Sequence, residues 1–251
     1  MPCYRGSPRE SDHRLAHDLA AEAGRRLLRL RADGASAEVG DRLSDEFLVG
    51  ALASRRPGDA VLSEESADRA DRSRADRVWI VDPLDGSREF GEPGREDWAV
   101  HVALWADGVL AAGAVAVPAK GVVRSTLPSR PAPPAPDRPV LLVSRSRPPA
   151  FLDELTARWP ALVRPMGSAG AKTASVLAGE ATAYLHAGGQ YEWDSAAPVA
   201  VAVAGGLRVR RLDGSAPRYN RPDPWLPDVV ICHPAHADAL WSAVDSVLAR
   251  A

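Results

Sequence analysis

Cysteine is scarce in this chain of 251 residues, which holds only Cys3 and Cys232. So few thiols exclude a small disulfide-stabilised scaffold. With no disulfide expected between the two, we expect a cytoplasmic protein. Long apolar runs are also missing. The most apolar stretches, Val109–Val117 and Pro198–Ala204, fall far short of the ~20 residues that span a bilayer. The first residues, Met1–Glu10, lack the apolar segment of a secretory signal.

An excess of basic charge is missing too. The 31 Lys and Arg residues face 33 Asp and Glu residues, and the formal net charge is −2. Dedicated nucleic-acid and membrane-surface binders usually carry a positive excess, so neither nucleic acid nor membrane is expected as a partner. An apolar share of 45% and a charged share of 25% are typical of a soluble globular protein. The length allows one large domain or two closely packed ones.

Hydrophobic periodicity suggests two halves. Residues 1–127 begin with an apolar helical stripe over Leu15–Leu30 and a second helix near Asp41, followed by strand-like runs and a hairpin signal at Asp107-Gly108. Residues 128–139 are rich in proline, which favours an exposed connection over a helix or a central strand. Residues 140–251 alternate short strands and helices. This pattern predicts layered α and β structure with at least one mixed sheet.

An acidic turn follows a predicted buried strand in the first half. The apolar run Val78–Val81 leads directly into Asp82, and a proline and a glycine then force a tight turn that carries Asp85. Two carboxylates this close repel each other unless a cation or a proton intervenes. Hard divalent ions such as Mg²⁺ prefer oxygen ligands of this kind, and the turn also exposes the Leu84 carbonyl. The alternative is a capped turn in which the aspartates accept backbone N–H groups.

Two further acidic clusters lie before and after this turn in the sequence. Glu64 and Glu65 directly follow a predicted strand, and Asp194 stands at the start of an alanine-rich segment predicted to be helical. Each cluster has a simple explanation when taken alone, as surface charge or as a helix cap. Together with Asp82 and Asp85, they favour one site assembled from distant parts of the chain.

These clusters share the order and spacing of a known family. The motifs are Ser63-Glu64-Glu65-Ser66, Asp82-Pro83-Leu84-Asp85-Gly86-Ser87 and Trp193-Asp194-Ser195-Ala196-Ala197. They resemble those of the inositol monophosphatase superfamily, which comprises Mg²⁺-dependent, lithium-sensitive phosphomonoesterases. Segments including Arg95–His101, Gly167–Lys172 and His186–Gln190 are most similar to the CysQ-type 3'(2'),5'-bisphosphate nucleotidases in their actinobacterial form. The resemblance covers Leu15–Leu248 and implies the family's α-β-α-β-α sandwich.

The resemblance also implies ligands for two or three Mg²⁺ ions. The matching ligands are the carboxylates of Glu64, Asp82, Asp85 and Asp194 and the carbonyl of Leu84. Asp41 and Ser87 match the pair that positions and deprotonates the attacking water. This sequence departs from the common pattern at Val39 and Ser87, where threonine is frequent, and at Ser63, where glycine is usual. Because Ser87 retains a hydroxyl, we expect the mechanism to be retained.

Substrate-binding residues are expected in two segments. Backbone N–H groups around Gly86 and Ser87 are expected to donate to the phosphate. Arg88 and Lys172 are each expected to pair with a second phosphate, the alternative being a solvated surface position. The segment Gly167, Ser168 and Ala169 allows a close backbone approach suited to ribose or adenine.

The expected activity is removal of the 3'-phosphate of adenosine 3',5'-bisphosphate (PAP), and of its sulfated form (PAPS), in sulfate assimilation. The resemblance also implies a homodimer. Hydrolysis of inositol phosphate or fructose 1,6-bisphosphate at the same metal site remains an alternative. So does a catalytically inactive protein that senses PAP. Hydrolysis of very short RNAs would use similar chemistry, but the sequence lacks an evident basic groove.

Overall fold

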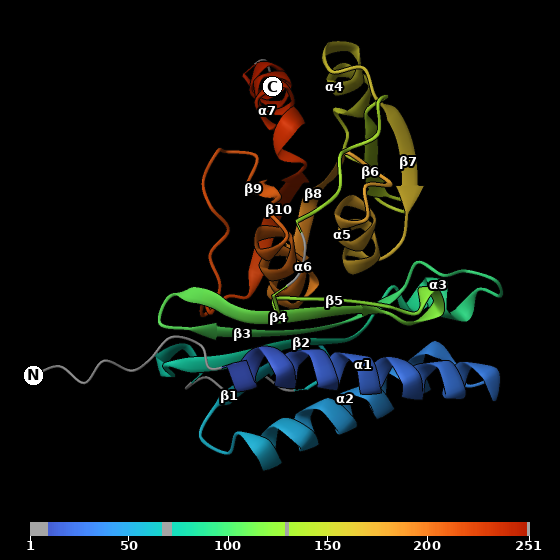
Figure 1. Ribbon diagram of the computed structural model, residues 1–251, viewed down its shortest axis with the longest axis vertical. Helices are drawn as coiled ribbons and strands as arrows, with labels where there is room; N and C mark the ends of the chain where they lie inside the picture. The colour runs from blue at the N-terminus through green and yellow to red at the C-terminus, as the bar shows by residue number, and fades with distance from the viewer. Residues whose placement is uncertain (1–9, 67–71, 129–130, 250–251) are drawn as a thin grey trace, which may run out of the picture.

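Two β-sheets and three layers of helices make up residues 10–66, 72–128 and 131–249, the part of the chain that this computed structural model describes. In Figure 1 the first sheet runs horizontally above a pair of blue helices, and the second sheet stands above it, with two helices between them. Further helices cover the far side of the second sheet. This arrangement confirms the predicted α-β-α-β-α sandwich.

The first sheet is built from consecutive strands. Its order is β1 (Ala60–Ser63), β2 (Arg77–Asp85), β3 (Ala99–Ala106), β4 (Val109–Val117) and β5 (Val122–Ser125). β1 and β2 are parallel, and the other neighbours are antiparallel. The predicted hairpin joins β3 to β4, and both of its turn residues, Asp107 and Gly108, have positive φ. Such a turn matches the right-handed twist of the strands that it connects.

Two long helices, α1 (Glu10–Ala32) and α2 (Ala37–Arg55), cover the outer face of this sheet. The predicted apolar stripe of α1, including Leu19 and Leu27, is buried in one cluster with Trp79 and Trp98 of the sheet side. The outer face of the sheet therefore supplies the apolar surface against which the stripe of α1 is buried.

The second sheet is mixed. Its order is β7 (Leu162–Met166), β6 (Val140–Ser144), β8 (Ala183–Tyr191), β10 (Trp225–Cys232) and β9 (Arg208–Arg210). β6 is parallel to both of its neighbours, whereas β10 is antiparallel to β8 and β9. The remaining proline-rich residues before β6, numbered 131–139, form neither helix nor strand.

Alanine-rich helices fill the space between the sheets. They are α5 (Ala169–Leu177) and α6 (Glu192–Ala204), and they share one buried cluster with residues of both sheets. The outer face of the second sheet is covered by α4 (Leu152–Arg158) and α7 (Pro234–Leu248). Three short helices complete the described part of the structure. η1 (Arg72–Arg74) precedes β2, α3 (Ser87–Gly91) follows β2, and η2 (Pro118–Lys120) follows β4.

Some elements differ from the predicted ones. α2 begins earlier, with Ser36 as its N-cap, so Asp41 lies in its second turn. α6 also begins earlier, at Glu192, so Asp194 lies in its first turn, three residues after the N-cap Tyr191. Strand β7 was not predicted, because it is a largely exposed edge strand that contains Pro165 and lacks an apolar alternation.

Cys232 is buried as a free thiol at the end of β10, and Cys3 lies outside the described residues. Among the described helices, none combines the length and the apolar character that crossing a membrane requires.

The contact between β4 and α6 makes a testable prediction. A Cβ atom at Gly113 would lie 2.7 Å from Ala200 Cβ, so the strand and the helix have no room for a methyl group here. We expect Gly113→Ala to lower the free energy of unfolding by about 1–3 kcal/mol. Gly50 lies in α2 with open space around it, and Gly50→Ala should raise stability by about 0.5–1 kcal/mol. Denaturant unfolding of both variants tests the steric argument, and equal effects would contradict it.

Candidate active site

The acidic turn lies where β2 leaves regular pairing with β3. Asp82 pairs with His101 and Asp85 pairs with Ala99, with a register shift between them. This irregularity lets two aspartates that are three residues apart lie in the same small volume. Gly86 then turns the chain into α3 with φ of 90°, a conformation that favours glycine.

Asp82 is almost completely buried, and one of its two carboxylate oxygens caps the turn by accepting a backbone N–H group. Its Oδ1 accepts a hydrogen bond from Leu84 N at 3.1 Å. Its Oδ2 has no hydrogen-bond partner within residues 10–66, 72–128 and 131–249. Burial, followed by repulsion from Asp85 and Glu64, raises the pKa of Asp82 well above its usual range. The cap therefore satisfies one oxygen of this carboxylate and leaves the other available.

Asp85 has the opposite environment. Its Oδ2 accepts hydrogen bonds from Ser168 Oγ at 2.6 Å and from Gly170 N at 2.9 Å. His101 Nε2 lies 3.1 Å from the same oxygen. Burial opposes ionisation of Asp85, but His101, Lys172 and these hydrogen bonds outweigh it and lower its pKa to about 2. Asp85 is therefore the carboxylate of the site that stays ionised without a metal.

His101 is a site residue that the sequence analysis did not assign. It is fully buried, and its Nδ1 lies 3.1 Å from the carbonyl oxygen of Trp193, which precedes Asp194. Within the described residues, Asp82, Asp85 and His101 form a group whose possible ligand atoms all lie within 4.8 Å of one another. The signal in the sequence was a single polar residue within the otherwise apolar run of β3.

His101 occupies space that is available only because Gly170 has no side chain. A Cβ atom at this position would lie 2.2 Å from His101 Nε2 and 2.8 Å from Val115 Cγ1. The close approach brings the Gly170 N–H onto Asp85. The imidazole and the glycine therefore fit each other across the boundary between β3 and α5.

Ser87 and Asp41 form the expected pair. Ser87 Oγ, in the first turn of α3, lies 3.1 Å from Asp41 Oδ2 and 3.0 Å from the carbonyl oxygen of Leu84. The other oxygen of the buried Asp41 carboxylate has no partner in the described part of the chain. Burial, followed by repulsion from Glu65, raises the pKa of Asp41 to about 7. Asp41 can therefore take up or release a proton near neutral pH.

Asp194 and Glu64 flank the buried group without belonging to it. Asp194 Oδ2 accepts from Tyr191 N at 2.6 Å, so this residue does cap its helix. Burial and the charge of Asp85 raise its pKa to about 6. Burial of the carboxyl group, followed by the charges of Asp194 and Asp41, also raises the pKa of Glu64. Glu64 as a whole is exposed, however, and water screens much of this effect.

Ser63 shows how one departure from the family pattern is accommodated. Its hydroxyl donates to Asp45 Oδ1 at 2.5 Å, and Ser66 donates to the other oxygen of the same carboxylate at 2.7 Å. Asp45 lies one turn after Asp41 in α2. These two hydrogen bonds connect the segment that carries Glu64 to the helix that carries Asp41.

The segment after β7 reaches the site from the second sheet. Gly167 N donates to Asp97 Oδ2 at 2.7 Å, and a Cβ atom at Gly167 would lie 2.3 Å from Glu89 Cδ. Ser168 has φ of 46° and caps α5, with its hydroxyl accepting from Ala171 N at 2.9 Å. Ser168 therefore contacts both Asp85 and the start of the helix.

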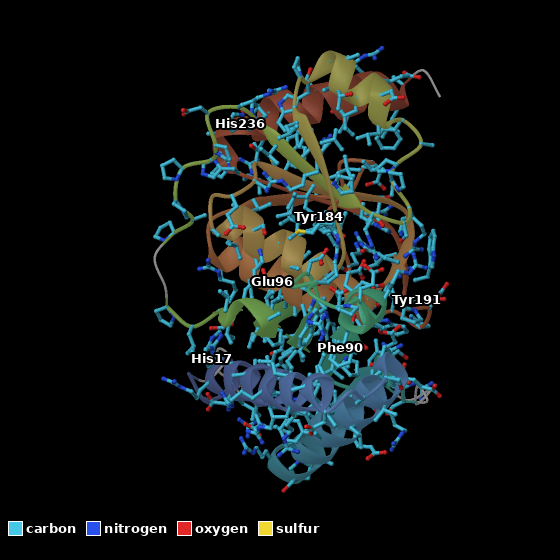
Figure 2. All side chains as sticks on the ribbon, turned by 90° about the vertical axis from the view of Figure 1, so that its right-hand side faces the viewer. His17, Phe90, Glu96, Tyr184, Tyr191 and His236 are labelled. Carbon is cyan, nitrogen blue, oxygen red and sulfur yellow. The ribbon has the colours of Figure 1, made fainter. Side chains whose placement is uncertain are left out.

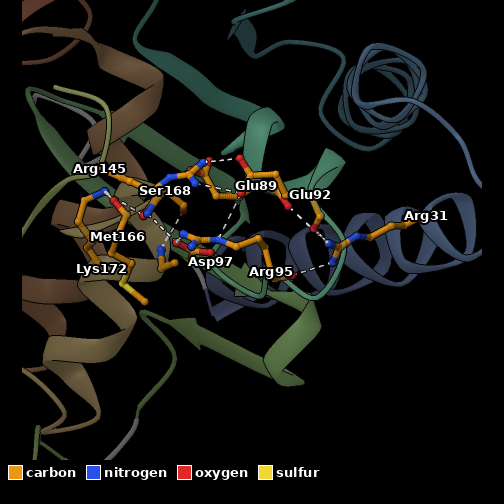
Figure 3. Close-up of polar contacts among 11 residues, drawn as sticks. Arg31, Glu89, Glu92, Arg95, Asp97, Arg145, Met166, Ser168 and Lys172 are labelled. Atoms are coloured by element: carbon orange, nitrogen blue, oxygen red, sulfur yellow. Dashed lines mark hydrogen bonds and ion pairs between the residues drawn. The ribbon is translucent and has the colours of Figure 1, made fainter. Parts of the chain in front are cut away.

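Lys172 is buried, which excludes the surface alternative. Its Nζ donates to the carbonyl oxygens of Gly167 at 2.9 Å and Met166 at 3.2 Å (Figure 3). It also lies 4.9 Å from the centre of the Tyr184 ring. Burial lowers its pKa to about 8. Figure 2 shows Tyr184 in the interior and Tyr191 at the surface, near the two ends of β8.

Ion pairs from Arg145 and hydrogen bonds from Arg31 link the segment after Ser87 to both halves of the molecule (Figure 3). Arg145 makes two hydrogen bonds to the Glu92 carboxylate, at 2.7 and 2.9 Å, and one to Glu89 Oε1 at 3.0 Å. From α1, Arg31 donates to the carbonyl oxygens of Glu92 at 2.6 Å and Arg95 at 2.8 Å. The segment is therefore held from both sides. Of the other predicted site residues, Arg88 is exposed and Ala169 is buried.

The donor set suits a hard divalent cation. Buried oxygens of Asp82 and Asp41 lack hydrogen-bond partners within the described ranges. An unsatisfied buried carboxylate oxygen is costly, and a bound cation removes that cost. Oxygen donors predominate, and His101 provides nitrogen atoms beside them. The residues present therefore fit a metal-dependent site.

The raised pKa values predict how metal and pH affect stability. Asp41 and Asp194, with pKa values of about 7 and about 6, bind more protons in the folded than in the unfolded protein. Their contribution to stability therefore falls as pH rises from about 4 to about 7. Because metals bind the deprotonated carboxylates, we expect the Tm difference between Mg²⁺ and EDTA to widen from about pH 5 to about pH 7.5. In Asp41→Asn the widening should be smaller, and a difference independent of pH would contradict the argument.

Known proteins are similar to this chain along most of its length. Residues 15–133 and 137–249 match the model of the inositol monophosphatase family. The chain is 47% identical to 3'-phosphoadenosine 5'-phosphate phosphatase of Mycobacterium tuberculosis over 89% of each chain. It is 45% identical to the protein of the same name in Mycobacterium leprae over 94% of each chain. The crystal structure of CysQ from Bacteroides thetaiotaomicron matches with 26% identity and a TM-score of 0.75, over 90% of this chain and 98% of that one. The chain belongs to the inositol monophosphatase family.

Proposed function

We propose that this protein is a Mg²⁺-dependent, lithium-sensitive phosphatase that removes the 3'-phosphate of PAP and also accepts PAPS. The observation that carries the proposal is the joint presence of the buried Asp82–Asp85 pair and the Ser87–Asp41 pair. They occur in a chain 47% identical to a mycobacterial 3'-phosphoadenosine 5'-phosphate phosphatase.

The proposed metal ligands are those expected from the sequence. Glu64, Asp82, Asp85 and Asp194 would hold two or three Mg²⁺ ions together with the Leu84 carbonyl. Bound Mg²⁺ would neutralise charge on the phosphoryl group and make water a better nucleophile. Three of these carboxylates have raised pKa values, so a cation would replace the protons that otherwise reduce their repulsion.

The Ser87–Asp41 pair would orient and deprotonate the attacking water. Ser87 Oγ is within hydrogen-bond distance of Asp41 Oδ2, so its proton can pass to that carboxylate while the hydroxyl accepts one from water. A pKa of about 7 gives Asp41 a useful fraction of both protonation states near neutral pH. The Leu84 carbonyl, 3.0 Å away, restricts the direction of the hydroxyl group.

The proposed substrate-contacting segments come from both halves. Gly86, Ser87 and Arg88 begin α3, and Gly167, Ser168, Ala169 and Lys172 surround the start of α5. Asp85 joins the two segments through its hydrogen bonds to Ser168 and Gly170. A substrate bound between them would have its reacting phosphate beside the carboxylates and its nucleoside against the second half.

A substrate panel tests this function. We expect phosphate release from PAP to exceed release from inositol 1-phosphate and fructose 1,6-bisphosphate. The activity should be lost in EDTA and reduced by added lithium. A preference for inositol 1-phosphate or fructose 1,6-bisphosphate would retain the metal chemistry and overturn the nucleotide assignment. Binding of PAP without phosphate release would instead favour a sensor.

The serine position offers a matched pair of variants. Ser87→Ala removes the hydroxyl beside Asp41, and we expect kcat for PAP to fall by about 10²–10⁴-fold. Ser87→Thr keeps a hydroxyl and should retain most of the activity. Steady-state kinetics at saturating Mg²⁺ separate the two variants. Comparable losses in both would show that the hydroxyl is not what matters.

A further inference from the structure

Glu192 is a fully buried acid that the proposed mechanism does not use. It is the first residue of α6 and lies two residues before Asp194. Its Oε2 accepts a hydrogen bond from Asn220 N and its Oε1 accepts one from Arg221 N, each at 2.8 Å. Its own N–H donates to the carbonyl oxygen of Pro224 at 2.8 Å. A buried carboxylate needs such donors, and here the loop between β9 and β10 supplies one to each oxygen.

The same loop packs along the first turn of α6. Asn220 has φ of 58°, a left-handed conformation that asparagine adopts more readily than most residues. Successive N–H groups around such a residue form a concave anion site, and the Glu192 carboxylate occupies it. Tyr219 OH lies 3.2 Å from Oγ of Ser195, the residue after Asp194. Figure 1 shows this loop running from the second sheet to the level of the first.

Arg72 binds the same two loop residues. It lies in η1, between the segment that carries Glu64 and the start of β2, and only 2% of its surface is exposed. Its Nη1 donates to Asn220 Oδ1 at 2.9 Å, and its Nη2 donates to the carbonyl oxygen of Arg221 at 3.0 Å. A cation from the first half of the chain and the Glu192 anion from the second half therefore hold one loop between them, in a buried polar network.

The network continues along α6 into the candidate site. Trp193, which follows Glu192, is held through its carbonyl oxygen by His101 Nδ1 at 3.1 Å. Asp194 comes next, and its carboxylate accepts from Tyr191 N at 2.6 Å. The position of Asp194 therefore depends on where the first turn of α6 is fixed, and Glu192 fixes the first residue of that turn.

We propose that Arg72, Asn220 and Glu192 form a positioning network that sets the affinity of the candidate site for divalent cations. The network holds the first turn of α6, and through it Asp194, against the acidic turn of the first sheet. This inference rests on the proposed function, because it assumes that Asp194 is a metal ligand. The three residues act through Asp194 and take no part in the proton transfer. Breaking the network leaves the acidic turn in place, so the site binds cations more weakly.

Binding of Mn²⁺ to the metal-free protein tests the network without any substrate. Mn²⁺ is the probe because it suits the same oxygen ligands as Mg²⁺, and its affinity is measured by calorimetric titration. We expect Arg72→Ala to weaken binding by about 10- to 100-fold, the usual effect of removing a group that orients metal ligands. Arg72→Lys keeps the charge without the forked donors and should recover part of the affinity. Glu192→Gln replaces one acceptor oxygen with a donor and should weaken binding as well.

Arg77→Ala is the matched control. Arg77 also joins segments of the first half, through ion pairs to Asp59 at 2.9 Å and Asp12 at 3.3 Å, but it begins β2, at the opposite end of the strand from Asp85. Thermal unfolding in EDTA should show a lower Tm for both alanine variants, with weaker Mn²⁺ binding in Arg72→Ala alone. If Arg72→Ala does not fold, Arg72→Lys and Glu192→Gln provide the same comparison. Wild-type affinity in the folded variants would overturn the inference, because the network would then contribute to stability only.

A titration without substrate separates this inference from the proposed reaction. If the wild type binds Mn²⁺ but releases no phosphate from PAP, and Arg72→Ala binds Mn²⁺ more weakly, the network is assigned correctly and the proposed reaction is wrong. If the wild type hydrolyses PAP and folded Arg72→Ala retains full Mn²⁺ affinity, the reaction is correct and the network is wrong. A wild type that binds no divalent cation would overturn both.

Discussion

Electrostatic repulsion among carboxylates in one small volume is the constraint on which the rest of the site depends. Asp41, Asp82 and Asp85 are buried, Asp194 is half-buried, and Glu64 lies at their edge. The fold tolerates one full negative charge, on Asp85, by surrounding it with Ser168, the Gly170 N–H and His101. The other groups have raised pKa values, so without a metal they reduce the repulsion by binding protons. A protein that places charge in this way gains stability from a cation at the same place.

The carboxylates are held together by contacts between the two sheets. Asp85 comes from the first sheet, whereas its donors Ser168 and Gly170 come from the segment leading into α5. His101 likewise connects β3 to the residue before Asp194. The Arg145 ion pairs join the end of β6 to the segment after Ser87. Formation of the site and packing of the two sheets are therefore coupled, because the same residues do both.

The two sheets contribute different kinds of residue to the candidate site. The first sheet supplies the acidic turn and, through α2 and α3, the Asp41–Ser87 pair, the residues to which the proposed reaction is assigned. The segment that follows β7 of the second sheet supplies a hydrogen-bond donor, Ser168, and a buried cation, Lys172.

Local sequence determined the elements that carry the acidic turn. Three local patterns each predicted a structural element: the apolar run ending in Asp82 predicted β2, the residues Asp107-Gly108 predicted the hairpin turn, and the apolar stripe predicted α1. Each pattern involves only residues that are close together in the chain. Three acidic motifs in a recognisable order predicted the family. The sequence did not reveal that Lys172 is buried, that His101 lies between two aspartates, or that β7 completes an edge. Those properties depend on residues distant in sequence, such as Tyr184 beside Lys172 and Gly170 beside His101. The packing of α5 between the two sheets brings such residues together, and burial then decides which charges persist.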